Sequence, residues 1–240
     1  MERLDKFLVT RGKGSRREVQ KLIRSGAVTV NGTVCRSPEQ KINAEQDAVS
    51  VSGQAVCADE HIYIMLNKPA GVVSATEDKH ERTVIDILPS ELRRPGLFPA
   101  GRLDKDTEGL LIITDDGDFA HRMLSPRKHV MKQYVAALDG EITGEMIRRF
   151  ADGVVFSDGT VCQPAQLRLQ SEDDKTVGIV GICEGKYHQV KKMFATMGRK
   201  VVHLQRISIG NLYLDSKLPI GNAKKLTKLD IDSIFLVDVH

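Results

Sequence analysis

The chain has 240 residues, a formal net charge of +3 and four cysteines. A chain of this length can bury a sizeable core without disulfides or metal ions, and its widely spaced cysteines form neither Cys-x-x-Cys pairs nor a disulfide framework. No apolar stretch is long enough to span a membrane and the first residues lack a signal-peptide core, so we expect a cytoplasmic protein without a membrane partner.

Positive charge is concentrated in three segments. Residues 1–36 carry nine Lys or Arg against three Asp or Glu, while residues 119–138 and 186–206 carry four and six Lys or Arg and no Asp or Glu. Local positive potential of this kind is typical of proteins that bind a nucleic-acid backbone. The alternative is that these residues are only solvated helix faces.

Residues 1–56 are predicted to form a small domain of two helices and a hairpin. Ser15 and Glu18 have the spacing of a capping box, and Gly26 is a typical helix end. The exposed side of this helix is basic, and we expect it to bind RNA phosphates through Arg16, Arg17, Lys21 and Arg24. The pair Asn31-Gly32 predicts a tight hairpin where a helix-turn-helix domain would have its recognition helix, which favours RNA over DNA.

We expect residues 57–61 to be a linker and residues 62–240 to form a mixed α/β domain. Short apolar or alternating runs predict its strands and 3.6-residue periodicity predicts its helices. The expected strands are 62–66, 72–74, 110–113, 132–138, 154–156, 160–162, 165–169, 177–183 and 201–209. The expected helices are 118–124, 143–151, 188–198 and 227–236.

Three residues of this domain are candidates for chemistry. Asp104 lies on a loop just before the buried strand 110–113, although an Asp in this context is more often a turn or capping residue. Tyr134 is near the start of a strand, where core packing is the ordinary interpretation. Lys191 lies in the first turn of a helix, where a cation opposes the helix dipole and therefore needs an anion nearby.

These segments, in this order, resemble the pseudouridine synthases that modify ribosomal RNA, and in particular the small-subunit branch. The matching motifs are Lys68-Pro69-x-Gly71, Gly101-Arg102-Leu103-Asp104, Lys132-x-Tyr134 and the run from Glu184 to Met193. Residues 1–56 resemble the S4 RNA-binding domain. The resemblance implies an α+β protein, in which a small RNA-binding domain precedes a largely antiparallel sheet with flanking helices.

The resemblance also implies a reaction and roles for the residues. A uridine of ribosomal RNA, most simply of the 16S small-subunit RNA, would be flipped out, detached at nitrogen, rotated and rejoined through carbon. Asp104 would act on the sugar, by a nucleophilic or an elimination route, Lys191 would keep Asp104 charged, and Tyr134 would pack on the uracil and relay a proton. Arg102 would fill the gap left by the flipped base. Further substrate contacts are expected from Lys68, Lys132, His188 and Gln189.

The isomerisation has no net redox change, so we expect no cofactor and no metal. The expected partner is ribosomal RNA or a ribosomal assembly intermediate, bound by a monomer. Two rivals remain open from the sequence: a non-catalytic RNA-binding or ribosome-assembly protein, and an RNA methyltransferase with the same N-terminal domain. A methyltransferase should have a Gly-rich nucleotide loop after its first strand, where this sequence has 67–71, Asn-Lys-Pro-Ala-Gly.

Overall fold

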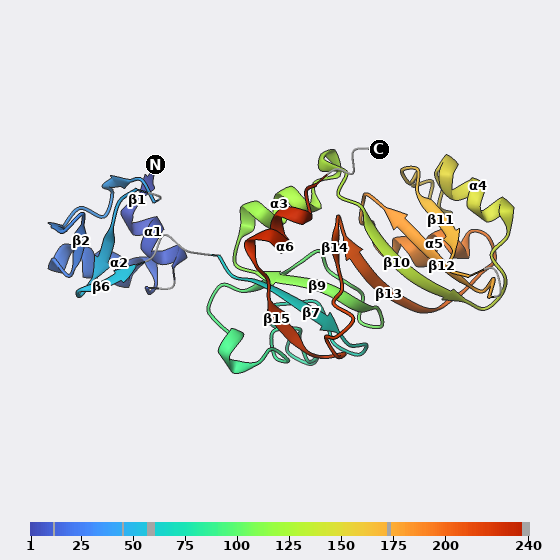
Figure 1. Cartoon of the computed structure of the whole chain (residues 1–240), viewed down its shortest axis with the longest axis horizontal. Helices are drawn as coiled ribbons and strands as arrows, with labels where there is room; N and C mark the ends of the chain where they lie inside the picture. The colour runs from blue at the N-terminus through green and yellow to red at the C-terminus, as the bar shows by residue number, and fades with distance from the viewer. Residues whose placement is uncertain (12, 45, 57–60, 172–173, 237–240) are drawn as a thin grey trace. The chain divides into compact units, whose positions relative to one another are not determined.

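The computed structural model describes residues 1–11, 13–44, 46–56, 61–171 and 174–236. The chain divides into two compact units, Met1–His61 and Ile62–His240 (Figure 1). Residues 57–60 of the expected linker lie outside the described residues. Each unit has its own hydrophobic core and is described by itself.

The first unit packs two helices against a small antiparallel sheet with the strand order β3-β2-β5-β6. The predicted capping box at Ser15 and Glu18 is confirmed, as is the end of the helix at Gly26, which has φ +86°. The hairpin is confirmed as well, with both Asn31 and Gly32 at positive φ. The element bounds are α1 Leu4–Thr10, α2 Arg16–Ser25, β1 Glu2–Arg3, β2 Val28–Val30, β3 Thr33–Cys35, β4 Lys41–Ile42, β5 Val49–Val51 and β6 Gln54–Val56.

A buried carboxylate ties the two helices of this unit together. Asp5 is fully buried and accepts two hydrogen bonds of 3.0 Å from the Arg3 guanidinium and one of 3.1 Å from Gln20 of α2. The bonds from Arg3, together with that from Gln20, outweigh the effect of burial and lower the pKa of Asp5 to about 2. The partners of Asp5 therefore hold α2 in a fixed position.

The second unit is built on one nine-stranded sheet, whose central order is β11-β12-β10-β13-β9-β7-β15. β14 pairs with β13, and β8 pairs with β9. The strand bounds are β7 Tyr63–Lys68, β8 Phe98–Ala100, β9 Glu108–Thr114, β10 Lys132–Leu138, β11 Gln166–Leu169, β12 Val177–Ile182, β13 Val201–Ile209, β14 Leu212–Tyr213 and β15 Ala223–Lys225. The helices are α3 Gly117–Leu124, α4 Gly144–Asp152, α5 Gln189–Ala195 and α6 Lys228–Ser233, with short 3₁₀ turns at Ser90–Leu92 and Pro126–Lys128.

Both faces of the central strand β9 are covered. Leu110 and Ile112 point into a cluster with residues of α3 and α6, whereas Leu111 and Ile113 point into a larger cluster that also contains residues of α4 and α5. Figure 1 shows α3 and α6 together beside one half of the sheet, and α4 beside the other half. This explains why β9 is a continuous apolar run instead of an alternating one.

Among the described strands of this sheet, β9 and β13 pair in parallel. The other pairings of named strands in the sheet are antiparallel. The parallel contact is short, joining Glu108 to Gln205 and Gly109 to Arg206. A β-carbon on Gly109 would lie 2.3 Å from the carbonyl oxygen of Arg206, so the two backbones approach closely only because this residue is glycine.

The predicted α+β class is confirmed, but five of the expected elements differ in the structure. The expected strands at 72–74, 154–156 and 160–162 are isolated bridges, Val73 to Thr83 and Val155 to Val161. Val155 and Val161 are exposed, so their side chains have no face of a sheet to pack against. The expected helices at 188–198 and 227–236 are shorter, α5 and α6, and each ends in turns.

Candidate functional site

The loop between β8 and β9 brings Asp104 to a small pocket at the sheet. Its carboxylate accepts a 3.1 Å hydrogen bond from Nζ of Lys191, and its other oxygen lies 3.5 Å from Nε2 of His188. The Asp104 side chain is 27% exposed, so a substrate can reach it from solvent. Asp104 belongs to one sequence motif and His188 and Lys191 to another, and the fold brings the two motifs into contact.

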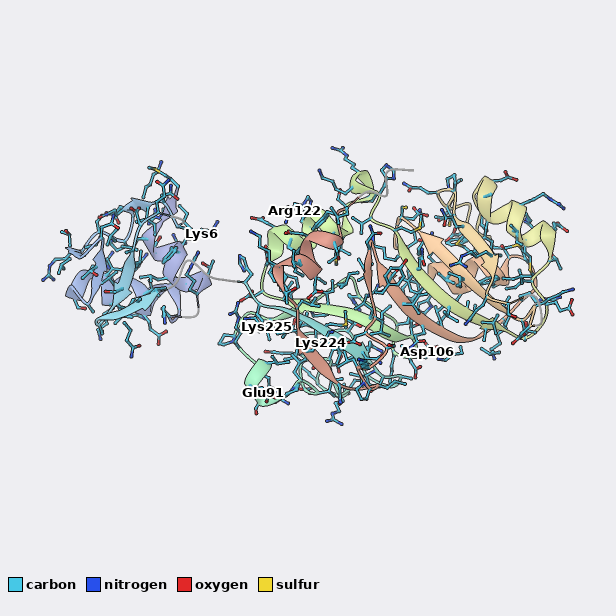
Figure 2. All side chains as sticks on the ribbon, viewed as in Figure 1. Lys6, Glu91, Asp106, Arg122, Lys224 and Lys225 are labelled. Carbon is cyan, nitrogen blue, oxygen red and sulfur yellow. The ribbon has the colours of Figure 1, made fainter. Side chains whose placement is uncertain are left out.

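Lys191 bridges two carboxylates. Besides Asp104 it donates to Asp106 at 2.5 Å, and Figure 2 labels Asp106 on the ribbon. Partial burial lowers the pKa of Lys191, but the hydrogen bonds to Asp106 and Asp104 outweigh burial and raise it above the ordinary lysine value. The same hydrogen bond lowers the pKa of Asp106. The predicted need of this lysine for an anion is therefore met by two acids.

Tyr134 lies on β10 with its side chain buried and lines the same pocket. Its hydroxyl accepts a 3.4 Å hydrogen bond from Arg206, a buried residue of β13. Arg206 also donates to the carbonyl of Leu110 at 2.8 Å and to that of Gly101 at 2.7 Å. One guanidinium thus joins Tyr134 to the start of the loop that carries Asp104.

Arg206 was not predicted from the sequence as part of the site, since it counted only as one charge in a basic segment. A signal was available, because Leu204, Arg206 and Ser208 alternate along the strand with residues of the opposite face. All three are buried in the structure. A charged residue on the same face of a strand as buried residues is expected to lie inside the protein and to bond to other protein groups.

The expected substrate contact by Lys68 is corrected by the structure. Lys68 is fully buried at the end of β7, and its ammonium donates to the carbonyl oxygens of Pro69, Asp104, Lys105 and Thr107 at 2.9 to 3.3 Å. Burial lowers its pKa to about 8. The side chain holds the Asp104 loop from beneath and does not face the pocket.

The expected substrate contact by Lys132 is also corrected by the structure. It is 5% exposed, points to the same side of β10 as Tyr134, and donates a 3.3 Å hydrogen bond to the carbonyl of Met123. Burial, with a smaller effect of the nearby Arg206, lowers the pKa of Lys132 to about 8. Its ammonium lies inside the protein, where RNA phosphates do not reach.

A turn that is held by side-chain hydrogen bonds precedes α5 and contributes to the pocket. The side chain of Gln189 donates to Glu184 at 2.7 Å and accepts from the backbone amide of Lys186 at 2.9 Å, and Lys186 also pairs with Glu184. Gln189 lines the pocket, but these bonds occupy its amide, so its expected substrate contact becomes a structural one. His188 follows this turn with φ +53° and remains half-exposed.

The pocket is lined by six of the site residues that the sequence analysis expected, together with Thr107, Lys186, Gly185 and apolar residues; the six are Arg102, Asp104, Tyr134, His188, Gln189 and Lys191. Arg102 is exposed at its rim. A carboxylate held beside an ammonium and across from a tyrosine suits attack on, or proton removal from, an electron-poor sugar, and a planar base fits against the ring. Within the described residues no group of His, Cys, Asp and Glu is arranged to hold a metal ion.

The first unit presents a separate basic surface. Arg16, Arg17, Lys21 and Arg24 of α2 are all exposed, as predicted, and Arg17, Lys21 and Arg24 line a shallow hollow with Gln20 and Ser25. Arg16 also lies 3.6 Å from Asp5. In the described part of the chain, none of the helices is long and apolar enough to cross a membrane.

Comparisons with known proteins agree with this geometry. Residues 62–196 match the RNA pseudouridylate synthase family, and residues 2–49 match the S4 domain. The chain is 44% identical to the uncharacterized RNA pseudouridine synthase YtzG of Bacillus subtilis (strain 168), over 95% of this chain and 96% of that protein. It is 39% identical to ribosomal small subunit pseudouridine synthase A of Escherichia coli (strain K12), over 97% of this chain and 99% of that protein.

A solved structure extends the comparison to three dimensions. The crystal structure of a pseudouridylate synthase that is 35% identical in sequence superimposes with a TM-score of 0.68, covering 98% of this chain and 100% of the other. These matches overturn the alternatives of a helix-turn-helix domain and of a methyltransferase. The chain therefore belongs to the RNA pseudouridine synthases, the isomerases that convert uridine to pseudouridine in RNA, and it carries an S4 RNA-binding domain in its N-terminal part.

Proposed function

We propose that this enzyme isomerises a uridine of the small-subunit ribosomal RNA, free or in an assembly intermediate, with Asp104 as the residue that acts on the sugar. The observation that carries the proposal is the contact of Asp104 with Lys191 at 3.1 Å inside a pocket that Tyr134 also lines. The small-subunit substrate is supported by relatives about 40% identical that are named ribosomal small subunit pseudouridine synthase A.

Each side chain has a physical task in this proposal. The ammonium of Lys191, 3.1 Å from the carboxylate of Asp104, supplies the positive charge that pairs with it. Tyr134 offers its ring to the uracil and its hydroxyl as a proton relay when the new carbon bond forms. Arg102, exposed at the rim, would occupy the space that the flipped base leaves in the RNA. His188 would contact the substrate next to Asp104.

The first unit would supply affinity without chemistry. Its exposed basic helix α2 would bind phosphates, which position an RNA but do not read its bases. We propose that the enzyme acts as a monomer, and a ribosomal RNA substrate would place it in the cytoplasm.

The test is to map pseudouridines in ribosomal RNA from three strains: the parent, a strain without the gene, and a strain in which only Asp104→Asn is expressed. We expect one small-subunit pseudouridine to disappear in both altered strains. Loss from the large-subunit RNA would overturn the substrate assignment. Restoration by Asp104→Asn would overturn the role of Asp104, and no loss in the strain without the gene would overturn the proposal as a whole.

A further inference from the structure

An exposed aromatic ring stands beside the pocket and has no part in the mechanism above. Tyr187 is 74% exposed, although it directly precedes His188, whose ring contacts Asp104. The two rings are stacked, with centroids 3.8 Å apart and planes inclined by 20°. A large exposed ring on the rim of a substrate pocket is a feature that a partner of suitable chemistry can cover.

The ring is presented on a rigid support. Gln189 bonds to both Glu184 and the amide of Lys186, and Glu184 accepts a further hydrogen bond from the amide of Gln163. These contacts fix the turn on both sides of Tyr187. An aromatic ring held in place loses little entropy when a second ring stacks on it.

The surroundings favour a base over a bare phosphate. Nζ of Lys192 lies 5.2 Å from the centre of the Tyr187 ring and 5.5 Å from that of Phe156. Lys192 and Phe156 line a hollow of about 220 Å³, and Asp158 lines it too, so the positive charge of Lys192 has an acidic residue nearby. A flat aromatic surface with nearly balanced charge suits the face of a nucleobase.

We infer that Tyr187, stacked on His188, forms a platform for the RNA base next to the uridine that enters the pocket. The inference rests on the proposed function, because a uridine bound beside Asp104 brings its neighbours to the rim of the pocket. Enzymes that flip a base commonly contact the flanking nucleotides, and single-stranded bases stack on aromatic side chains.

The test compares Tyr187→Ala and Tyr187→Phe with the parent, using the full chain and an unmodified small-subunit ribosomal RNA transcript. Equilibrium binding and steady-state turnover are measured separately. Tyr187→Ala should weaken binding and raise KM by about 5- to 150-fold, the range measured for one base on one ring, with little change in kcat. Tyr187→Phe keeps the ring and should match the parent, and so should the control Tyr213→Ala, which removes an exposed tyrosine of β14.

Two results would overturn the platform. Binding by Tyr187→Ala equal to that of the parent would mean that no base stacks there. A fall in kcat with unchanged binding would mean that the ring only supports His188. If the parent binds the RNA but forms no pseudouridine, the proposed function fails, while the binding comparison still decides whether the platform exists.

Discussion

Replacing Arg206 with methionine should destabilise the second unit, because this buried guanidinium holds three groups from different segments. Its bonds to the carbonyls of Leu110 and Gly101 are short, at 2.8 and 2.7 Å, and its bond to the Tyr134 hydroxyl is 3.4 Å. Each buried carbonyl left without a donor costs about 1–3 kcal/mol, and the long third bond adds little. We therefore expect the free energy of unfolding to fall by about 3 kcal/mol, since methionine retains much of the side-chain volume.

The assay is urea unfolding followed by circular dichroism. With a denaturant slope of about 2 kcal/mol per molar, the midpoint of the second unit should fall by about 1.5 M. The matched control is Arg168→Met, which removes an exposed arginine of β11 and should change the free energy of unfolding by less than about 0.5 kcal/mol. Arg206→Lys keeps the charge but not the planar fork, and should lie between the two.

The same variants test whether Arg206 positions the site. In conditions where Arg206→Lys is fully folded, its kcat should be reduced, because one ammonium cannot hold Gly101 and Tyr134 together. KM for the RNA should change little, since Arg206 is buried away from solvent. A midpoint for Arg206→Met equal to that of Arg168→Met would refute the reasoning, because the three bonds would then contribute nothing.

The other predictions concern the pocket, a buried charge and the RNA-binding helix. Asp104→Asn should bind RNA but have turnover reduced by about 10³-fold or more, whereas Asp106→Asn, a 75% exposed neighbour on the same lysine, should retain most of it. Lys191→Met removes the ammonium that bonds to Asp104 and Asp106, so kcat should fall while RNA binding changes little; a kcat equal to that of the parent would show that this pair is not needed for turnover. The pKa of Lys132 is about 8 in the folded protein and about 10.4 in the unfolded chain. Between these two pH values the unfolded chain binds more protons than the folded protein, so the free energy of unfolding of the parent should rise from pH 8 to 10. In Lys132→Met the rise should be smaller, because only Lys68 still contributes to it, and the free energy of unfolding at pH 7 should be higher than that of the parent by up to about 3 kcal/mol. Urea unfolding that shows the same dependence of stability on pH in the variant and the parent would contradict this prediction. Removing the four charges of α2 named above should weaken RNA binding and lower its salt slope by roughly 0.7 to 0.9 for each phosphate that is no longer bound, with unchanged kcat at saturating RNA.

Much of the site was predictable from sequence because its residues lie in separate, ordered motifs. Asp104, Tyr134 and Lys191 were assigned as a group, and all three line the pocket. The charged residues that the fold buries were harder to predict. Lys68 precedes a proline and so resembled a turn residue, yet β7 continues through it, since it pairs with Gly109.

Alternation is informative where it is applied to charged residues. Lys132 has the same parity along its strand as Tyr134, Ala136 and Leu138, and all four are buried. The expectation that Lys132 contacts RNA came from its place in the Lys132-x-Tyr134 motif and from its positive charge, without regard to this alternation. The strands expected at 154–156 and 160–162 were wrong for another reason. Val155 and Val161 have strand-like composition, but whether such residues extend into a sheet depends on distant neighbours that no local pattern reveals.

The short parallel contact between β9 and β13 determines when the enzyme can become active during its synthesis. Asp104 lies just before β9. Tyr134 lies on β10, which pairs with β13, and Lys191 lies on α5, which comes just before β13 in the chain. Since β9 and β13 are far apart in the chain, this pairing forms only after nearly the whole second unit has left the ribosome. A nascent or truncated chain can therefore expose its basic S4 domain to RNA before it holds a complete pocket. Binding competence precedes catalytic competence, and fragments that end before β13 should occupy RNA without modifying it.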